Sequence, residues 1–288
     1  MDGWPVVVLP TLGGKQIWGD EFLYAGYRIQ QNVYTKHHRL LGPNDARLAA
    51  GTFDHCHDTF RRLRDQREVR PVSDHVVLLL HGIFRSKDSF GPMVKALQAA
   101  GYEAHGVNYP STRQGLDDHA DQVERLLERL EGARRVSFVT HSMGGIVARV
   151  LLAREQAAWR SRVQPHRLVM IATPNRGAEL ATRVTQLPGS WAVGGPSLVQ
   201  LRAEHHEAIP LPTIPFGIVA GARGDGRGFN PWLPGDNDMT VTVDSTRLEG
   251  AEDFLVVKAV HTFIQVQPAV IEATVRYLES GRFGEQAA

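Results

Sequence analysis

Short apolar segments recur along the chain at intervals that suit β-strands separated by helices. Their near-continuous hydrophobicity favours strands buried on both faces, as in a parallel sheet. The expected strands cover residues 6–9, 75–80, 103–107, 135–139, 167–172, 216–220 and 253–257.

Amphipathic helical patterns lie between several of these strands. Asp88 or Ser89 can cap a helix with one apolar face that ends near Gly101. Residues 117–131 again place leucine and valine on one side and charged residues on the other. Pro268 opens a last amphipathic helix. This alternation predicts an α/β fold with a mostly parallel, doubly wound sheet.

Two regions fall outside the alternation. Residues 1–73 contain the expected strand at 6–9 and a short helical pattern near 58–65. Residues 176–214, between two strands, contain two weak helical stretches and have the size of a small cap. Neither region has a linker-like composition at its border, so we expect residues 1–288 to form a single domain. No role is assigned to the N-terminal elaboration.

Charge and composition narrow the class of protein. Lys and Arg total 32 and Asp and Glu total 31, without a long basic run, so the electrostatic signature of nucleic-acid binding is missing. No apolar run is long enough to span a membrane, and the first apolar stretch is too short for a signal peptide. The single Cys56 fits a reducing compartment. These features predict a cytoplasmic protein and leave its oligomeric state unknown.

The segment VTHSMGG, residues 139–145, is the first candidate for chemistry. Ser142 stands where an apolar strand turns into an apolar helix, as in a nucleophile elbow. Gly144 is expected where a side chain would collide with the strand. Thr140 stands where the usual G-x-S-x-G pattern has its first glycine. The alternative is a serine that only caps a helix.

An acyl-transfer nucleophile needs hydrogen-bond donors for the developing oxyanion. The loop after His81 and Gly82 supplies a candidate, because Gly82 lets the backbone turn so that the Ile83 N–H points into the site. The Met143 N–H, directly after the serine, is the second candidate. Phe84 is a substitute for Ile83. The alternative is an ordinary turn from strand to helix.

The general base is expected to be His261, which follows the last strand and precedes the final helix. Three aspartates lie before it and give the chain order serine, acid, histidine. Asp238 is favoured because it leads the alternating run TVTV. Asp236 stays open, although it could only cap a turn, and Asp244 is expected to be a solvated strand residue. The ring of His141 is expected to point away from Ser142.

These motifs resemble the α/β-hydrolase superfamily, and within it bacterial lipases and esterases, including GPI-inositol-deacylase-like hydrolases. The matching segments lie within residues 75–280 and read LLLHGIF, VTHSMGGIVAR, VMIATPNRGAELA, NDMTVTVDSTRL and VVKAVHTFI. The resemblance implies Ser142 as nucleophile, Asp238 as acid and His261 as base. It also implies that the amides of Ile83 and Met143 form the oxyanion hole.

The resemblance covers neither residues 1–73 nor every position of the motifs. The family often has a glycine directly after the acid, where this chain has Met239. The geometry of that loop is therefore an open question, and Asp236 remains the alternative acid.

The expected activity is hydrolysis of a small-molecule or lipid ester through an acyl-enzyme, without a metal or other cofactor. A thioesterase, amidase or acyltransferase could use the same residues, and a non-catalytic binding protein is the alternative outside enzymes. The spacing of His55, Cys56 and His57 does not match a metal site. Five aromatic residues near the motifs are candidates for lining an acyl pocket. They are Phe84, Phe90, Trp191, Trp232 and Phe263.

Overall fold

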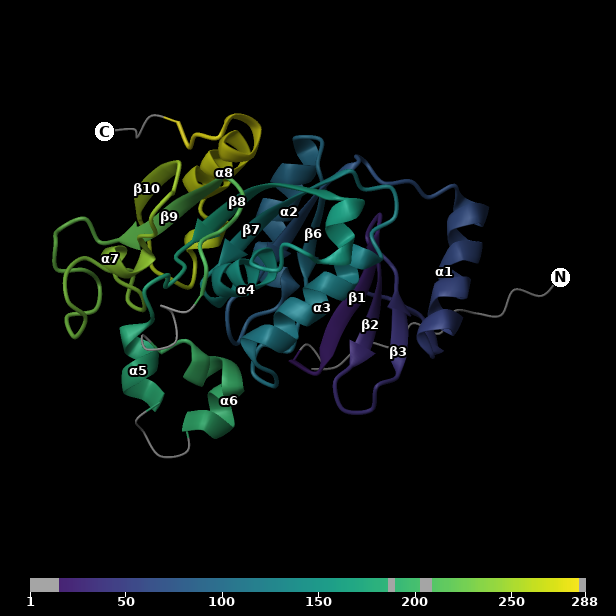
Figure 1. Cartoon of the computed structure of the whole chain (residues 1–288), viewed down its shortest axis with the longest axis horizontal. Coiled ribbons are helices and arrows are strands. Elements are labelled where there is room, and N and C mark those ends of the chain that lie inside the picture. Colours follow the sequence, from purple (N-terminus) through teal and green to yellow (C-terminus); the bar gives the residue numbers. More distant parts are fainter. Residues whose placement is uncertain (1–15, 186–189, 203–208, 285–288) are drawn as a thin grey trace.

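The structure is a computed structural model that describes residues 16–185, 190–202 and 209–284. Within them the chain forms a central six-stranded sheet and a four-stranded sheet near the N-terminus (Figure 1). The strand expected at residues 6–9 lies outside the described residues.

The central sheet has the strand order β10-β9-β8-β7-β5-β6, and every neighbouring pair is parallel. Each strand begins and ends within a few residues of an expected apolar segment, so the predicted parallel sheet is confirmed. The strands are β5 (His75–Leu80), β6 (Glu103–Val107), β7 (Arg135–His141), β8 (Gln164–Ile171), β9 (Phe216–Ala222) and β10 (Asp253–Lys258).

Helices cover both faces of this sheet. Side chains alternate between the faces of a strand, so Val77 and Leu79 pack on one side and Leu78 and Leu80 on the other. The first side is covered by α2 (Gly91–Ala99) and α8 (Pro268–Ser280). The second is covered by α3 (Leu116–Glu128) and α4 (Met143–Leu152). Short 3₁₀ helices are η2 (Lys87–Phe90), η3 (Ala158–Ser161) and η5 (Ile264–Val266). The fold is therefore a doubly wound α/β sheet.

The N-terminal sheet contains four antiparallel strands that the hydrophobic pattern did not predict. They are β1 (Trp18–Tyr24), β2 (Tyr27–Asn32), β3 (His38–Leu41) and β4 (Arg47–Gly51). Helix α1 (Phe53–Arg67) contains the helical pattern noticed near 58–65 and packs its buried Cys56 and Phe60 on this sheet. Strand β1 packs this sheet against α3 (Figure 1).

The segment between β8 and β9 carries α5 (Glu179–Thr185) and α6 (Ser190–Gln200), which pack against each other at one end of the molecule (Figure 1). Gly195 interrupts α6 with φ of 65°. A Cβ on Gly195 would lie 2.0 Å from the Thr112 carbonyl oxygen, so only glycine permits this approach. The segment is anchored to the loop before α3 by the Ser197 hydroxyl, which donates a hydrogen bond to the Gln114 carbonyl oxygen at 2.7 Å.

A buried arginine ties the other end of this segment to α4. The Arg149 guanidinium donates hydrogen bonds to the carbonyl oxygens of Ile209 and Pro210, 2.5 and 3.2 Å away. It also reaches the carbonyl of Asn175 at 3.2 Å. Burial lowers the pKa of Arg149 to about 10, so the side chain keeps its charge at neutral pH.

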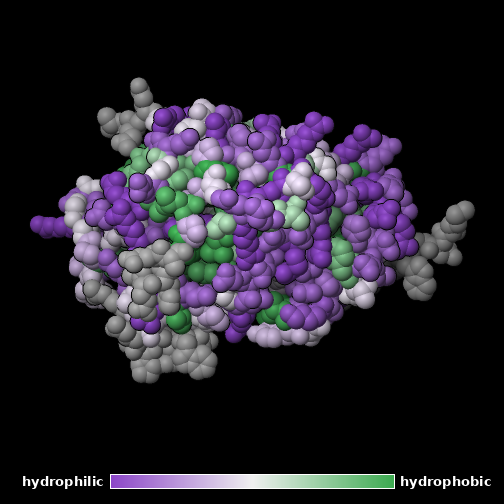
Figure 2. Space-filling model, in the orientation of Figure 1, coloured by the Kyte–Doolittle hydropathy of each residue, from purple (hydrophilic) through white to green (hydrophobic). Residues whose placement is uncertain are grey.

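The surface differs along the molecule. Figure 2 shows hydrophilic residues over α1 and α3, whereas hydrophobic residues gather between α4 and the segment with α5 and α6. A hollow of about 330 Å³ in this region is lined by Leu116, Val150, Ile209 and Pro210 among others. None of the helices in the described residues is long and apolar enough to cross a membrane.

The N-terminal sheet and α1 depend on one aromatic cluster. Phe60 is fully buried against the rings of Phe22, Tyr24 and Tyr27. We expect Phe60→Ala to lower the free energy of unfolding by about 3–5 kcal/mol in urea titrations, because it leaves a cavity. The exposed neighbour Arg61 provides the control, and Arg61→Ala is expected to change it by less than about 0.5 kcal/mol. Equal effects of the two substitutions would contradict this packing.

Candidate active site

Ser142 lies on the sharp turn between β7 and α4. Its φ of 55° is in the left-handed region, which is strained for a residue with a side chain. A Cβ on Gly144 would lie 2.1 Å from the Leu80 carbonyl oxygen, and one on Gly145 would lie 2.1 Å from Thr173 Oγ1. Both positions therefore require glycine. The turn has the strand–turn–helix geometry of a nucleophile elbow.

Thr140, in place of the first motif glycine, fits inside the sheet. Its side chain is fully buried, and its hydroxyl donates a hydrogen bond to the Val169 carbonyl oxygen at 3.1 Å. The polar group is thus satisfied between β7 and β8, and the substitution leaves the turn at Ser142 intact.

The structure brings Ser142, His261 and Asp238 together, although they are far apart in the sequence. His261 Nε2 lies 3.0 Å from Ser142 Oγ, and His261 Nδ1 lies 2.7 Å from Asp238 Oδ2. The other oxygen of the buried Asp238 accepts the N–H groups of Thr240 and Val241 at 3.0 and 2.7 Å. The carboxylate is thus fixed from one side while it orients the imidazole from the other.

The two other candidate acids are engaged elsewhere. The Asp236 carboxylate accepts the N–H groups of Arg223 and Gly224 at 2.8 and 2.9 Å and so holds the turn after β9. Asp244 is largely exposed and lies 3.5 Å from Arg247. Of the three aspartates, Asp238 is the one hydrogen bonded to His261 in the described residues.

The strand expected in the TVTV run is wrong. Residues 240 and 241 lie in a bend, Thr242 forms an isolated antiparallel bridge with Asn237, and Val243–Thr246 forms the short helix α7. Thr242 caps this helix by accepting the Ser245 N–H at 3.1 Å. The Asp238 carboxylate accepts the N–H groups of Thr240 and Val241. The chain therefore bends there and does not continue as a strand. Asp244 accordingly lies in the first turn of a helix and not in a strand.

Met239 occupies the position where the resembling proteins often carry glycine. Its φ of 86° lies in the left-handed region, and its side chain is half exposed. The turn after Asp238 thus keeps the backbone geometry that favours glycine, at the cost of strain in Met239.

His141 has a structural contact that its sequence position alone did not reveal. Its Nε2–H donates to the His261 carbonyl oxygen at 3.0 Å, and the two rings are 4.8 Å apart. Burial and the neighbouring His261 hold the pKa of His141 well below its ordinary value. His141 therefore stays uncharged at neutral pH while it anchors the loop that carries His261.

The loop after β5 forms a turn beside the serine. The Arg85 N–H donates to the Gly82 carbonyl oxygen at 3.3 Å, which closes the turn over residues 82–85. A Cβ on Gly82 would lie 3.0 Å from Ser142 Cβ, so glycine lets this backbone approach the serine closely. Phe84 has a φ of 61°, which is a strained value for phenylalanine.

Two backbone amides at this edge remain available to a ligand. Met143 is the first residue of α4, so its N–H has no acceptor within the helix. Within residues 16–185, 190–202 and 209–284, no hydrogen bond involves the Ile83 N–H. The Phe84 N–H, by contrast, donates to Ser111 Oγ at 3.1 Å. Phe84 is therefore a poorer candidate donor than Ile83.

Three of the five candidate aromatic residues stand exposed near the motifs. Phe84, Trp232 and Phe263 are 52%, 77% and 60% exposed. Phe90 is instead fully buried under the sheet with α2, so it cannot line a pocket at this edge. The Trp191 side chain lies outside the described residues.

Cys56 and His57 of α1 contact other parts of the chain, whereas His55 is exposed. Cys56 is buried in the core under the N-terminal sheet, and His57 Nε2 lies 3.4 Å from Glu131. The described part of the chain contains no group of three or more His, Cys, Asp or Glu residues that could hold a metal ion.

Comparison with known proteins concerns mainly the fold. A sequence-family model described as a domain of unknown function, DUF7379, matches residues 45–187. None of the curated proteins matches this chain in sequence. A metagenomic carboxyl esterase has a similar structure, with a TM-score of 0.58 and 18% identity over 74% of this chain and 78% of its own. The mature lipase BlEst2 of Bacillus licheniformis has a TM-score of 0.55 and 20% identity, covering 66% of this chain and 85% of its own.

A hydrolase described as putative, from Agrobacterium vitis S4, has a TM-score of 0.54 and 15% identity, covering 73% of this chain and 89% of its own. The chain has the α/β-hydrolase fold.

The close contact at Gly144 leads to a stability prediction, for which Gly91 in α2 serves as the control. Gly144→Ala is expected to lower the free energy of unfolding by about 3 kcal/mol or more, because its methyl group meets the Leu80 carbonyl. A Cβ on Gly91, in α2, would meet no atom within 4 Å. Gly91→Ala should therefore raise the free energy of unfolding by up to about 1 kcal/mol. Thermal unfolding measures both. If the Gly144→Ala protein were as stable as the Gly91→Ala protein, the close approach of α4 to the end of β5 would be refuted.

Proposed function

We propose that this protein is a serine hydrolase that cleaves carboxylic esters through an acyl-enzyme. The observation that carries the proposal is the pair of hydrogen bonds from His261, 3.0 Å to Ser142 Oγ and 2.7 Å to Asp238 Oδ2. A serine hydroxyl is a weak nucleophile unless an adjacent base takes its proton. An imidazole held between the serine and a buried carboxylate has the arrangement that this task needs.

In the first half of the reaction, Ser142 Oγ attacks the ester carbonyl carbon while His261 Nε2 takes the hydroxyl proton. The carbonyl oxygen becomes an oxyanion, and the N–H groups of Ile83 and Met143 donate hydrogen bonds to it. Loss of one such donor typically costs about 3–4 kcal/mol of transition-state stabilisation. The tetrahedral intermediate then breaks its bond to the alkoxy oxygen, and His261 returns the proton to the leaving alcohol.

In the second half, water replaces the alcohol. His261 takes a proton from the water as its oxygen attacks the acyl carbon, and a second tetrahedral intermediate forms. Collapse of this intermediate releases the carboxylic acid and returns the proton to Ser142 Oγ. Asp238 accepts the His261 Nδ1–H throughout and stabilises the charged imidazolium. The sequence of steps needs no metal or organic cofactor.

The surroundings favour an ester with an apolar acyl group. Phe84 adjoins the proposed oxyanion amide, Met239 follows the acid, and Phe263 lies two residues after the base, and all three are more than half exposed. Such side chains can contact an acyl chain without competing for its polar atoms. His141, kept uncharged by burial, adds no positive charge that would attract an anionic substrate instead.

The assignment is tested by kinetics on p-nitrophenyl esters. Ser142→Ala is expected to lower kcat by a factor of about 10⁴ or more, since the nucleophile is removed. Asp238→Asn should lower kcat about 10³- to 10⁴-fold, because it no longer orients the base.

The exposed Ser161 and the nearby Asp236 supply matched controls. Ser161→Ala should leave kcat unchanged, and Asp236→Asn should affect it far less than Asp238→Asn. Hydrolysis by Ser142→Ala at the wild-type rate would reject the proposed function. A series of acyl chain lengths then separates the two ester classes, since an esterase prefers short chains and a lipase long emulsified ones.

A further inference from the structure

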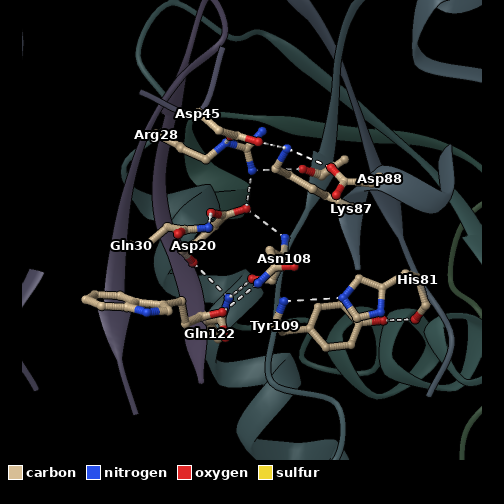
Figure 3. A network of polar contacts seen from close by, with 12 residues as sticks. Asp20, Arg28, Gln30, Asp45, His81, Lys87, Asp88, Asn108, Tyr109 and Gln122 are labelled. Atoms are coloured by element: carbon tan, nitrogen blue, oxygen red, sulfur yellow. Dashed lines mark hydrogen bonds and ion pairs between the residues drawn. The ribbon is translucent and has the colours of Figure 1, made fainter. Parts of the chain in front are cut away.

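The N-terminal sheet, for which the sequence indicated no role, reaches the active-site edge through a buried polar network (Figure 3). We propose that this sheet is a positioning device for the Ile83 N–H, with Asp20 and Gln16 as positioning residues. The inference rests on the proposed function, since it assigns them to the oxyanion hole of that reaction. It adds residues that lie outside the α/β sheet and its loops.

The network begins where β1 meets the end of β6. Asp20 is fully buried, and its N–H donates to the Asn108 carbonyl oxygen at 2.8 Å. The Asn108 N–H donates in return to Asp20 Oδ2 at 2.7 Å. Gln122 Nε2 on α3 donates to the carbonyl oxygens of both residues at 2.9 Å. The backbone at Asn108 is therefore fixed in place by the N-terminal sheet.

The Asp20 carboxylate is itself held from β2. Arg28 Nη1 and Gln30 Nε2 donate to its two oxygens at 2.6 and 2.7 Å (Figure 3). The charge of the buried aspartate is thereby paired, and its position depends on the antiparallel pairing of β1 with β2. The position of Asn108 thus depends on the paired strands β1 and β2 and not on one side chain alone.

The next residue passes this placement to His81. The ring of Tyr109 stacks on the His81 ring with a centroid distance of 4.1 Å, and its hydroxyl donates to the His81 carbonyl oxygen. The Tyr109 N–H lies 3.4 Å from His81 Nε2, which accepts it. Burial lowers the pKa of His81 to about 4, so at neutral pH Nε2 stays an acceptor and Nδ1 carries the proton.

His81 in turn holds the peptide that bears the proposed oxyanion donor. Its Nδ1–H donates to the Gly82 carbonyl oxygen at 2.8 Å. In a trans peptide the carbonyl and the following N–H point in opposite directions, so fixing the Gly82 oxygen also fixes the direction of the Ile83 N–H. Donors aimed in advance at the oxyanion avoid the cost of reorganisation during the reaction.

Gln16 holds the far end of the same turn. Its Nε2 donates to the Arg85 carbonyl oxygen at 2.7 Å, and its Oε1 accepts the hydroxyls of Ser111 and Thr112 at 3.1 and 3.3 Å. Ser111 Oγ accepts the Phe84 N–H. The strained backbone of Phe84 persists because neighbouring groups fix it from both sides.

The test compares three variants that each remove or alter one polar side chain of the N-terminal segment. Gln16→Leu removes the hydrogen bonds to Arg85 and Ser111. Asp20→Asn weakens the hydrogen bond that the Asp20 side chain accepts from the Asn108 N–H. The control is Gln31→Leu in β2, because Gln31 contacts His38 and has no bond to residues 82–85 or 108–112 among the described contacts. Rates are divided by the concentration of active sites, which is titrated to completion with a fluorophosphonate. A smaller fraction of folded protein then does not lower the measured kcat.

We expect kcat per labelled site to fall about 10- to 100-fold in Gln16→Leu and Asp20→Asn, because a displaced donor stabilises the transition state poorly. KM should change by less than about twofold, since ground-state binding does not use this donor. The affinity for an alkyl boronic acid, which forms a tetrahedral adduct with the serine, should fall by a factor similar to kcat. Gln31→Leu should match wild type in all three.

Equal kcat and boronate affinity in Gln16→Leu and Gln31→Leu would overturn the inference even if Asp20→Asn failed to fold. A larger KM with unchanged kcat would overturn it too, since that result places Gln16 in substrate binding. Failure of the proposed function has a different signature. In that case the wild-type protein takes up no fluorophosphonate, and both proposals fall.

Discussion

The arrangement of the candidate site at the C-terminal edge of the central sheet depends on one backbone constraint. This constraint is the left-handed conformation of Ser142 between β7 and α4. The start of α4 approaches the strands on either side of β7 so closely that Gly144 faces the Leu80 carbonyl at the end of β5, and Gly145 faces the Thr173 hydroxyl just after β8. That approach lifts the serine above the C-terminal edge of the sheet and puts it at the N-terminus of α4. Because β5 is the neighbour of β7, the same edge also carries the 82–85 turn.

The other loops at this edge are joined to one another before any substrate arrives. The His261 N–H donates to the Asp238 carbonyl oxygen at 2.8 Å, in addition to the bond between their side chains. His141 accompanies Ser142 along the chain and binds the His261 carbonyl, so the serine loop and the histidine loop are connected by a second route. The fixed geometry favours proton transfer between groups that already lie within hydrogen-bond distance.

The sequence predicts the central sheet well because its strands are apolar on both faces. It fails for β1 and β2, where Asp20, Arg28 and Gln30 are buried but satisfied by one another across strands, which a local hydrophobic pattern cannot register. Chain order gave the candidate acids, but the choice between Asp236 and Asp238 depends on the turn that Asp238 itself builds. That turn also bends residues that read as a strand.

In the proposed reaction, Ser142 attacks the ester carbonyl while the amides of Ile83 and Met143 hold the oxyanion. A crystal structure of the protein after reaction with a fluorophosphonate tests it most directly, since the phosphorus mimics the tetrahedral carbon. We expect phosphorus bonded to Ser142 Oγ and a phosphoryl oxygen about 2.7–3.1 Å from both amide nitrogens. A bond to any other residue, or a phosphoryl oxygen turned away from both amides, would contradict it.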